Sequence, residues 1–463
     1  MMIGQASFLV SAFVINFGLA RLFGPEDYGT YGVVMSVLIV VELFVITGIP
    51  ELIQKFGGEE PEKMYLLKRK TLPWQIIYSF LIFAVFWFCV PMISTSFGDG
   101  HLTKFIRIAS FDIVFYGLFK YYQGLQNGLH KFDRHAALGI TYAISKVAAI
   151  FGFVFSGYSL NGALIGNALG SVGGLIAGLI ATRLPKQTGD LQGIPYFKFI
   201  VPNILYFVSL YLFFCIDLWF VKIYTTGTDV GYYVSAGALA KIPYVFSIAL
   251  SAALLPSIAK ATKMKDEKQV KELTGESTRY VLMFLILFVV VVNRTSVAVV
   301  RLLFGRAYEG AAQPLSILIF GLSFITIFAI LNTILQSRNR MTLSFVLMFG
   351  LVILDIITNY FFVPRYGILG AAAATTLASG VGALLGWYFV NLEITSFLPS
   401  VSLLKMVGSA IIVFTVSALL PFPDSLVFLK IFILSGVYFV SLWLIGEMKQ
   451  ADLLRLKSMV SKS

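Results

Sequence analysis

Long apolar runs separated by short polar stretches make up most of the chain. Each run holds about twenty predominantly hydrophobic residues, the length an α-helix needs to cross a bilayer. Breaking the runs where charges, prolines or glycines cluster gives fourteen spans, at residues 2–22, 28–49, 72–95, 103–126, 132–156, 160–182, 198–223, 231–257, 277–300, 309–335, 340–362, 367–391, 400–420 and 426–446. Turn sequences such as FGPEDYG (23–29) and VPRYGILG (363–370) support the breaks, because proline and glycine interrupt helices. The pattern therefore predicts an all-α membrane protein with about fourteen transmembrane helices.

The composition agrees with this class. Of the 463 residues, 58% are hydrophobic and only 13% are charged, whereas soluble domains average about 25% charged residues. The mean hydropathy is +0.87. The first apolar run begins almost at Met1 without a basic lead or a small-residue cleavage site, so we expect it to be a retained span rather than a signal peptide.

Lysine and arginine are distributed unevenly between the two sides of the predicted spans. With the N-terminus inside, 22 of the 35 fall in cytoplasmic segments, 7 fall on the opposite side and 6 lie within spans. Positive residues favour the cytoplasmic side, so both termini are predicted to be cytoplasmic. The net charge of +12 needs no nucleic-acid partner, because basic inner loops facing anionic membrane lipid account for it.

A ladder of small residues reveals an internal repeat. The run NGALIGNALGSVGGLIAGLI (161–180) has a glycine at every fourth position, and a shift of 208 residues places Gly or Ala at each matching position. The ten positions are Gly162, Gly166, Gly170, Gly174 and Gly178, then Gly370, Ala374, Ala378, Gly382 and Gly386. Such ladders let membrane helices approach closely, so we interpret them as packing seams. Because six spans are an even number, the two copies form a parallel repeat.

The repeat predicts the domain organisation. Residues 1–185 form an N-terminal lobe of spans 1–6, and residues 198–391 form a C-terminal lobe of spans 7–12. Residues 400–447 add spans 13 and 14, and residues 448–463 form a cytoplasmic tail. Two longer cytoplasmic loops, 51–70 and 260–278, are interpreted either as short helices on the membrane surface or as solvated linkers.

Ionisable residues inside predicted spans are the candidate site residues, because charge in the bilayer is costly and usually faces a cavity or a partner. Lys241 and Lys146 lie near the midplane and Glu42 somewhat below the middle; Glu42 and Lys241 are on spans 2 and 8, which are equivalent in the two copies. Equivalent helices of a two-lobe transporter face each other across a central site, so we predict a substrate cavity there, with Asn16 and Asp217 as further polar contacts. Additional intramembrane charges are Asp112, Lys120, Lys146, Arg294 and Asp355. For each, a structural ion pair such as Asp112 with Lys146 is the alternative.

Several kinds of chemistry lack support in the sequence. The three histidines have no metal-ligand spacing, so no metal site is predicted. There is no phosphate-binding loop of the G-x-x-x-x-G-K-[ST] type, and the predicted outer loops are too short for a catalytic domain. We therefore expect no enzyme activity and no cofactor beyond a coupling proton or sodium ion.

The chain resembles the polysaccharide transporters, the O-antigen-type flippases of the multidrug/oligosaccharidyl-lipid/polysaccharide (MOP) superfamily. The resemblance rests on LARLFGPEDYGTYGVVMS (19–36), FFCIDLWFVKIYTTGTDVGYYVSAGALAKIP (213–243), VVRLLFGRAYEGAAQPLSIL (299–318) and PRYGILGAAAATTLASG (364–380). It implies two bundles around a cavity lined by spans 1, 2, 7 and 8, so that the matching cavity residues are Asn16, Glu42, Asp217 and Lys241. It also implies flipping of undecaprenyl-diphosphate-linked oligosaccharides in a bacterial or archaeal cytoplasmic membrane, alongside a polymerase and other assembly proteins.

Three other functions remain open at this point. A cation-coupled multidrug exporter of the same superfamily would favour an acidic, aromatic cavity, which the deep lysines oppose. A membrane glycosyltransferase or polymerase would need larger outer loops. A scaffold of the same pathway would not need charges within its spans.

Overall fold

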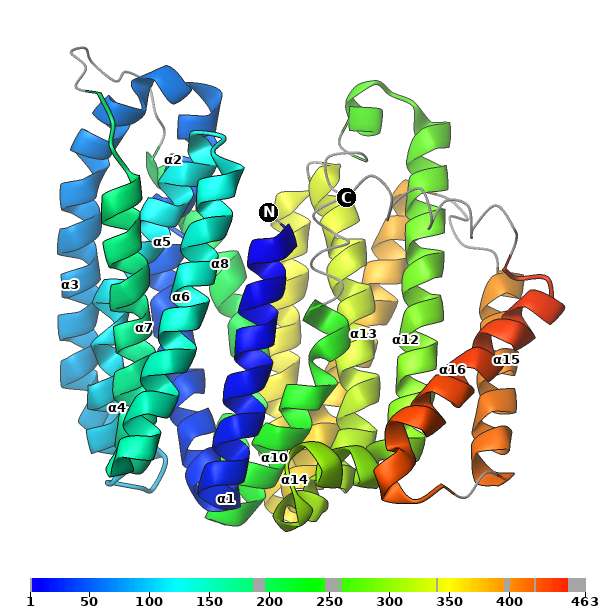
Figure 1. The fold of residues 1–463 in the computed structure, drawn as a ribbon. Helices are drawn as coiled ribbons and strands as arrows, with labels where there is room; N and C mark the ends of the chain where they lie inside the picture. Colours follow the sequence, from blue (N-terminus) through cyan, green and yellow to red (C-terminus); the bar gives the residue numbers. More distant parts are fainter. Residues whose placement is uncertain are drawn as a thin grey trace. The chain divides into compact units, whose positions relative to one another are not determined.

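The structure, a computed structural model, describes residues 2–185, 196–245, 258, 260–338, 340–394, 400–419 and 422–448. Within these residues every regular element is a helix, as the sequence predicted. The long helices of each part of the chain run side by side as bundles (Figure 1). The chain divides into two compact units, unit 1 (Met1–Val234) and unit 2 (Ser235–Ser463). The finer lobe limits, at 185 and 198, stay a prediction.

The helices of unit 1 follow the predicted spans closely. They are α1 (Met2–Ile46), α2 (Ile49–Glu59), α3 (Met64–Ser96), α4 (Leu102–Ser110), α5 (Asp112–Gly128), α6 (Phe132–Phe153), α7 (Ser159–Ala181), α8 (Tyr196–Phe213), α9 (Ile216–Tyr224) and α10 (Gly227–Ala240). The last of these continues past the unit boundary. Helix α2 occupies much of the segment 51–70 that was predicted to be a cytoplasmic loop, so that segment is helical rather than a simple linker.

The helices of unit 2 are fewer and longer. They are α12 (Glu267–Leu303), α13 (Ala312–Ser337), α14 (Met341–Glu393), α15 (Ser400–Leu419) and α16 (Val427–Leu444). Short 3₁₀ turns, η3 (Arg306–Ala311) and η4 (Asp424–Leu426), precede α13 and α16. The second predicted cytoplasmic loop, 260–278, is partly helical, since α12 begins within it.

Two of the helices are too long to be single spans. Helix α1 has 45 residues and α14 has 53, about twice the length that crosses a bilayer. Each contains a glycine with left-handed backbone, Gly24 at φ 76° and Gly367 at φ 55°, close to Pro25 and Pro364 respectively. An L-residue with a side chain rarely adopts this conformation, so both glycines end one helix and start the next. The predicted breaks at 23–29 and 363–370 are confirmed.

The described residues contain eight helices long and apolar enough to cross a membrane, or nine if the bent pair α8 and α9 counts as one span. This number is below fourteen partly because three of the eight, Ser7–Glu59, Phe132–Ala181 and Met341–Glu393, each join two predicted spans. Helices α4 and α5 divide the predicted fourth span at Phe111, and part of the eighth lies outside the described residues. The chain is therefore a multi-span membrane protein.

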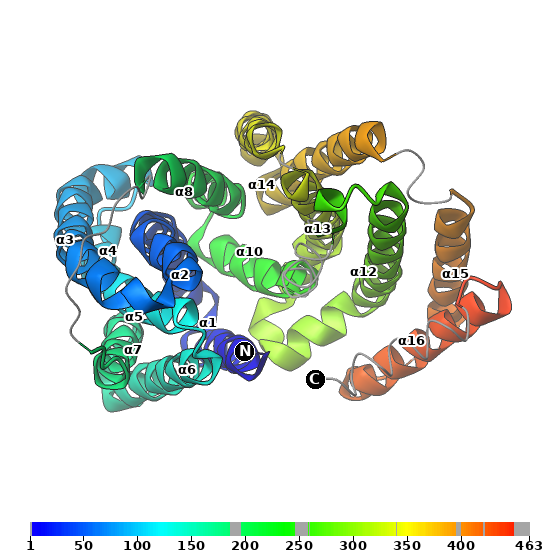
Figure 2. The same ribbon diagram turned by 90° about the horizontal axis from the view of Figure 1, so that it is seen from above.

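Helix α5 lies in the middle of unit 1. It packs against α1, α2, α3, α6 and α7, and Figure 2 shows it between α2 and α7. Most of its residues are buried, among them Asp112, Phe119 and Tyr121. A polar side chain on this helix is therefore enclosed by its neighbours on several sides.

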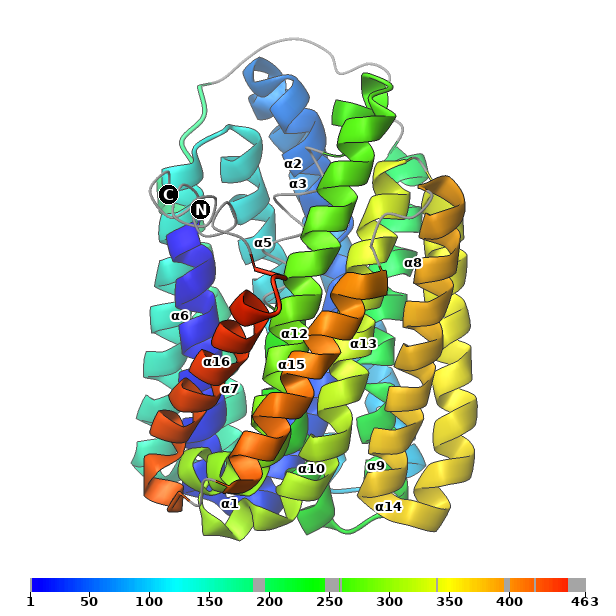
Figure 3. The same ribbon diagram turned by 90° about the vertical axis from the view of Figure 1, so that its right-hand side faces the viewer.

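Helices α15 and α16 form a pair at the side of α12, which Figure 3 shows from that side. Their remaining surface is apolar: Leu404 is 71% exposed, Phe428 is 64% exposed and Phe432 is 75% exposed. Large exposed apolar side chains on a membrane helix are suited to contact with lipid tails. This pair therefore presents a lipid-facing surface in unit 2.

The small-residue ladders are packing seams, as predicted. A Cβ at Gly166 would lie 2.5 Å from the backbone nitrogen of Ile150, and one at Gly170 would lie 2.6 Å from the Cα of Lys146. Helix α7 therefore touches the backbone of α6. In the second copy, a Cβ at Gly382 would meet the Leu351 side chain at 2.6 Å.

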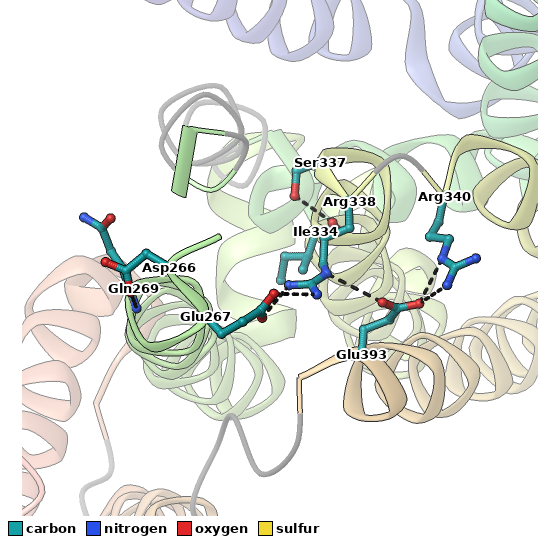
Figure 4. A network of polar contacts seen from close by, with 8 residues as sticks. All are labelled: Asp266, Glu267, Gln269, Ile334, Ser337, Arg338, Arg340 and Glu393. Carbon is teal, nitrogen blue, oxygen red and sulfur yellow. Dashed lines mark hydrogen bonds and ion pairs between the residues drawn. The ribbon is translucent and has the colours of Figure 1, made fainter. Parts of the chain in front are cut away.

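Ion pairs join three helix ends of unit 2, as Figure 4 shows. Arg338, just after α13, contacts Glu267 at the start of α12 at 3.0 Å and Glu393 at the end of α14 at 3.6 Å. Arg340 approaches the same Glu393 at 2.9 Å. The network fixes these ends against one another on the side predicted to be cytoplasmic.

Candidate functional site

The predicted site residues are distributed over both units. Unit 1 contains Asn16, Glu42, Asp112, Lys120, Lys146 and Asp217, and unit 2 contains Lys241, Arg294 and Asp355. Each unit is considered by itself. The predicted meeting of Glu42 with Lys241 across a central cavity stays a prediction.

Two carboxyl groups meet in the interior of unit 1. Glu42 lies in the second half of α1 and is 5% exposed, and Asp112 is the first residue of α5 and is 2% exposed. The two carboxyl groups lie within hydrogen-bonding range of each other. Two carboxyl groups can form a hydrogen bond only when one of them carries a proton. The pair is thus a place where a proton can be held between α1 and α5.

Helix α7 contributes two polar residues to this cluster. The Asn167 amide nitrogen donates a hydrogen bond to Oδ2 of Asp112, and Ser171 lies one turn further along and also faces Asp112. Sequence reasoning missed both residues. Their signal was present, because they are polar residues four positions apart in the glycine run, and Asn and Ser bridge membrane helices by hydrogen bonds.

Several oxygens of this cluster have no hydrogen-bond partner among the described residues. They are Oε1 of Glu42, Oδ1 of Asp112 and Oδ1 of Asn167. Leaving a buried polar atom unsatisfied costs about 1–3 kcal/mol, so several together need an explanation. All three are oxygens that accept hydrogen bonds and cannot donate one without an added proton. The arrangement suits a proton or a small cation.

Two lysines lie near the carboxyl pair. Lys146 of α6 interacts electrostatically with Asp112 and Glu42, yet its Nζ donates to the Tyr142 hydroxyl at 3.2 Å. No nitrogen–oxygen contact within 4.0 Å joins it to Asp112 among the described ion pairs. The ion pair weighed in the sequence analysis is therefore a longer-range attraction, and the direct partner of Asp112 is Asn167.

Lys120 occupies a different position on α5. Its Nζ donates to Oε1 of Gln123 at 2.9 Å and lies over the Tyr116 ring, 5.5 Å from the ring centre. Its charge reaches Glu51 and Glu42. The cluster in unit 1 is therefore mixed in charge, with two carboxyl groups and two ammonium groups among aromatic rings.

Asn16 is held by its neighbours. The Tyr28 hydroxyl donates to its Oδ1 at 2.8 Å, and its Nδ2 donates to the Ala12 carbonyl at 2.8 Å. Because Tyr28 follows the break at Gly24, this bond ties the two halves of α1 together. The contact gives Asn16 a structural role beside the predicted cavity role.

Asp217 lies at the start of α9, after the bend from α8. Its Oδ2 accepts a hydrogen bond from the Tyr233 hydroxyl at 2.6 Å, and its Oδ1 accepts one from the Leu218 backbone nitrogen at 2.7 Å. Tyr233 belongs to α10, so the carboxylate joins α9 to α10 within unit 1. Sequence reasoning did not single out Tyr233, which lies in the stretch 213–243 that carries the family resemblance.

The candidate residues of unit 2 are spread along different helices. Lys241 directly follows α10 and is half-buried. Asp355 is fully buried on α14, where the Asn359 amide donates to its Oδ1 at 3.0 Å. Arg294 of α12 lies over the Phe414 ring of α15, 4.6 Å from the ring centre.

Comparison with known proteins shows which family the chain belongs to. A model of the polysaccharide biosynthesis protein family matches residues 18–313. The chain is 26% identical over 401 residues to the uncharacterized membrane protein MJ1375 of Methanocaldococcus jannaschii, covering 82% of this chain and 93% of that protein. It is 23% identical over 181 residues to the probable low-salt glycan biosynthesis flippase Agl15 of Haloferax volcanii, covering 39% and 38%.

The fold has a close match among solved structures. The lipid II flippase MurJ in an inward closed conformation superposes with a TM-score of 0.78 at 18% identity, covering 95% of this chain and 98% of that one. The fold is therefore the MOP-superfamily fold that the resemblance predicted. Since the family model covers well over half of the residues, the chain belongs to the polysaccharide biosynthesis protein family, as a multi-span membrane protein.

Proposed function

We propose that the protein flips undecaprenyl-diphosphate-linked oligosaccharide repeat units across the cytoplasmic membrane. The observation that carries the proposal is a glycan-biosynthesis family on a transporter fold. The relative named as a probable glycan biosynthesis flippase supports the same substrate class. Released on the outer side, the repeat unit would pass to a polymerase and other assembly proteins.

The physical problem is the polar head of such a lipid. A diphosphate bearing several sugars cannot cross hydrocarbon unaided, because each unpaired polar group costs several kcal/mol there. Fourteen spans in two six-helix lobes plus two added helices, with both termini in the cytoplasm, would provide a cavity that opens to one side at a time. The polyprenyl tail would stay in lipid while the head crosses. In this proposal Lys241 contacts the diphosphate or an acidic sugar.

We assign proton coupling to the carboxyl pair of unit 1. Glu42 and Asp112 hold a proton between α1 and α5, with Asn167 and Ser171 of α7, Lys146 and Tyr142 of α6 and Lys120 and Tyr116 of α5 around them. Loss of that proton would place two like charges together and favour separation of the helices. A proton gradient would thereby act on the helices of unit 1. A sodium ion bound by the same oxygens is the alternative occupant.

The test uses purified protein in vesicles that contain a lipid-linked oligosaccharide in both leaflets. A membrane-impermeant sugar-modifying reagent reports the accessible fraction, with and without a proton or sodium gradient. We expect accessibility to rise beyond the outer-leaflet fraction, Lys241→Ala to lower the rate at least tenfold, and Glu42→Gln to remove the effect of the proton gradient. Lys104→Ala is the matched control, because it removes an exposed cation from α4.

Other outcomes point to the remaining functions. Efflux of cationic dyes without any sugar accessibility would establish a multidrug exporter instead. Extension or polymerisation of the lipid-linked sugar would establish an enzyme. If no lipid-linked sugar moves while complexes with assembly proteins form, the protein is a scaffold. Normal flipping by Lys241→Ala would refute the role of that lysine alone.

A further inference from the structure

A polar pocket of about 260 Å³ opens in unit 2, and none of its lining residues belongs to the spans predicted to line the central cavity. One wall is the stretch of α12 from Asn293 to Ala298, and the other is the link before α16 together with its first turn. It lies near the helix ends predicted to be outside. Arg294 and Lys430 both line it.

These two cations lack counter-ions within the described residues. No carboxylate oxygen lies within 4.0 Å of either one in the described ion pairs, and Arg294 instead contacts the Phe414 ring and lies 3.5 Å from the Ser417 hydroxyl. Arg294 lies six residues, roughly 9 Å, inside the predicted limit of its span at 300, at about 1.5 Å per residue. Lys430 lies four residues, roughly 6 Å, inside the limit at 426 by the same measure. Both therefore lie inside the predicted span limits, from where their long side chains can extend toward the lipid phosphates.

One acid also lines the pocket, and the cation that binds it is shared with a second acid, so this group keeps one net negative charge against the two positive charges of Arg294 and Lys430. Asp424 accepts a hydrogen bond from Arg301 at 2.6 Å, and Arg301 binds Glu309 at 2.6 Å as well. The pocket also borders the N-terminus of α16 at Val427, where the helix dipole favours anions. The site as a whole is therefore suited to a negatively charged group.

The surroundings indicate where such a group would come from. The pocket opens beside α15 and α16, whose outer surfaces carry exposed apolar residues such as Ile411, Phe428 and Phe432. A lipid held by its headgroup here would lay its tails along these helices. Arginine and lysine at a membrane interface bind phosphate by charge-assisted hydrogen bonds.

We propose that Arg294 and Lys430 form a binding site for the phosphate of an anionic ligand, with an outer-leaflet phospholipid as the expected source. The site is separate from the proposed transport cavity and does not depend on the flippase function. Its occupant neutralises two membrane-embedded cations and holds α12 to α16.

The test measures the melting temperature of the full chain, freed of lipid in detergent, after addition of phosphatidylglycerol, diacylglycerol or inorganic phosphate. Native mass spectrometry counts retained lipid. We expect phosphatidylglycerol to stabilise the protein and diacylglycerol, which lacks phosphate, to have no effect. Arg294→Gln and Lys430→Gln should each weaken the apparent affinity at least tenfold, and Arg306→Gln, an exposed cation outside the pocket lining, should not.

The three additives and the variants distinguish the possible ligands of the site. Stabilisation by inorganic phosphate that is equally lost in the variants would support the phosphate site and make free phosphate its ligand. Equal effects of phosphatidylglycerol and diacylglycerol, or unchanged affinity in both variants, would overturn the proposal. Because Arg294→Gln also removes the contact with Phe414, Lys430→Gln provides the independent variant.

Discussion

The seam between α6 and α7 predicts that a single methyl group at Gly166 will destabilise unit 1. The added Cβ of Gly166→Ala would lie 2.5 Å from both the backbone nitrogen and the Cα of Ile150, where ordinary contact begins at 3.4 Å. The shortfall is about 0.9 Å, and backbone atoms cannot rotate away from it as a side chain can. The two helices must therefore separate along the seam.

The size of the effect follows from two opposing terms. Overpacking a tight interior costs about 1–3 kcal/mol, and contact with fixed backbone belongs at the upper end. Alanine returns up to about 1 kcal/mol through its better helix propensity. We expect a net loss of about 2 kcal/mol, equivalent to a fall in melting temperature of roughly 4–8 °C for a unit of this size.

Three glycine-to-alanine variants with different space around the added Cβ test whether the seam causes the loss of stability. In detergent-purified protein, Gly174→Ala should lose less, because its Cβ meets the edge of the Phe119 ring at 2.7 Å and a ring can shift. Gly152→Ala on α6 is the control, since nothing lies within 4 Å of its Cβ, and it should be neutral or slightly stabilising. Melting temperatures that fall equally in all three variants, or a stable Gly166→Ala, would refute the seam as the cause.

Two further predictions concern ion pairs. Burial alone would raise the pKa of Asp99, but the hydrogen bond and charge of Lys222, 2.8 Å away, lower it below its ordinary value near 3.8. A carboxyl group whose pKa is lower in the folded than in the unfolded protein stabilises the fold at pH values above its unfolded pKa. This stabilisation is lost as the pH falls through the folded-state pKa. The stability advantage over Asp99→Asn should therefore be present at pH 6 and decrease as the pH falls below the ordinary value near 3.8, and an advantage that does not decrease in acid would contradict this. Arg338→Ala should cost about 2 kcal/mol because it removes the arginine that contacts Glu267 and one of the two arginines that contact Glu393, whereas Arg340→Ala, at an exposed position, should cost less than about 1 kcal/mol. Equal thermal shifts for the two arginine variants would refute the central place of Arg338.

Much of the fold was predictable because the governing forces are local. Helix length follows from bilayer thickness, and the breaks near Gly24 and Gly367 follow from glycine and proline backbone preferences. The spacing of small residues predicted the seam because positions four apart share a helix face. None of these inferences needs to know which helices are neighbours in space.

The site was less predictable because it depends on how each helix is rotated. Depth alone suggested Lys146 as the partner of Asp112, but the rotation of α7 brings Asn167 to that carboxylate instead. Likewise the sequence predicted Asn16 only as a polar contact of the cavity, whereas in the structure the Tyr28 hydroxyl, on the other side of a helix break, donates a hydrogen bond to it. Side-chain reach across elements is set by tertiary packing, which hydropathy and charge patterns do not encode.

The sequence of helix α7 must satisfy two requirements, close packing against its neighbours and polar contact with the buried carboxyl pair. One side carries the glycines that touch α6 and α5, and Asn167 and Ser171 face the carboxyl pair, so substitutions there affect either packing or the buried polar cluster. The opposite side, with Ile176, Leu179 and Ile180 exposed, has neither demand. In descendants of this protein, accepted mutations in α7 should therefore accumulate on that outer side. Drift would exchange one apolar residue for another there, while the glycine ladder stays unchanged.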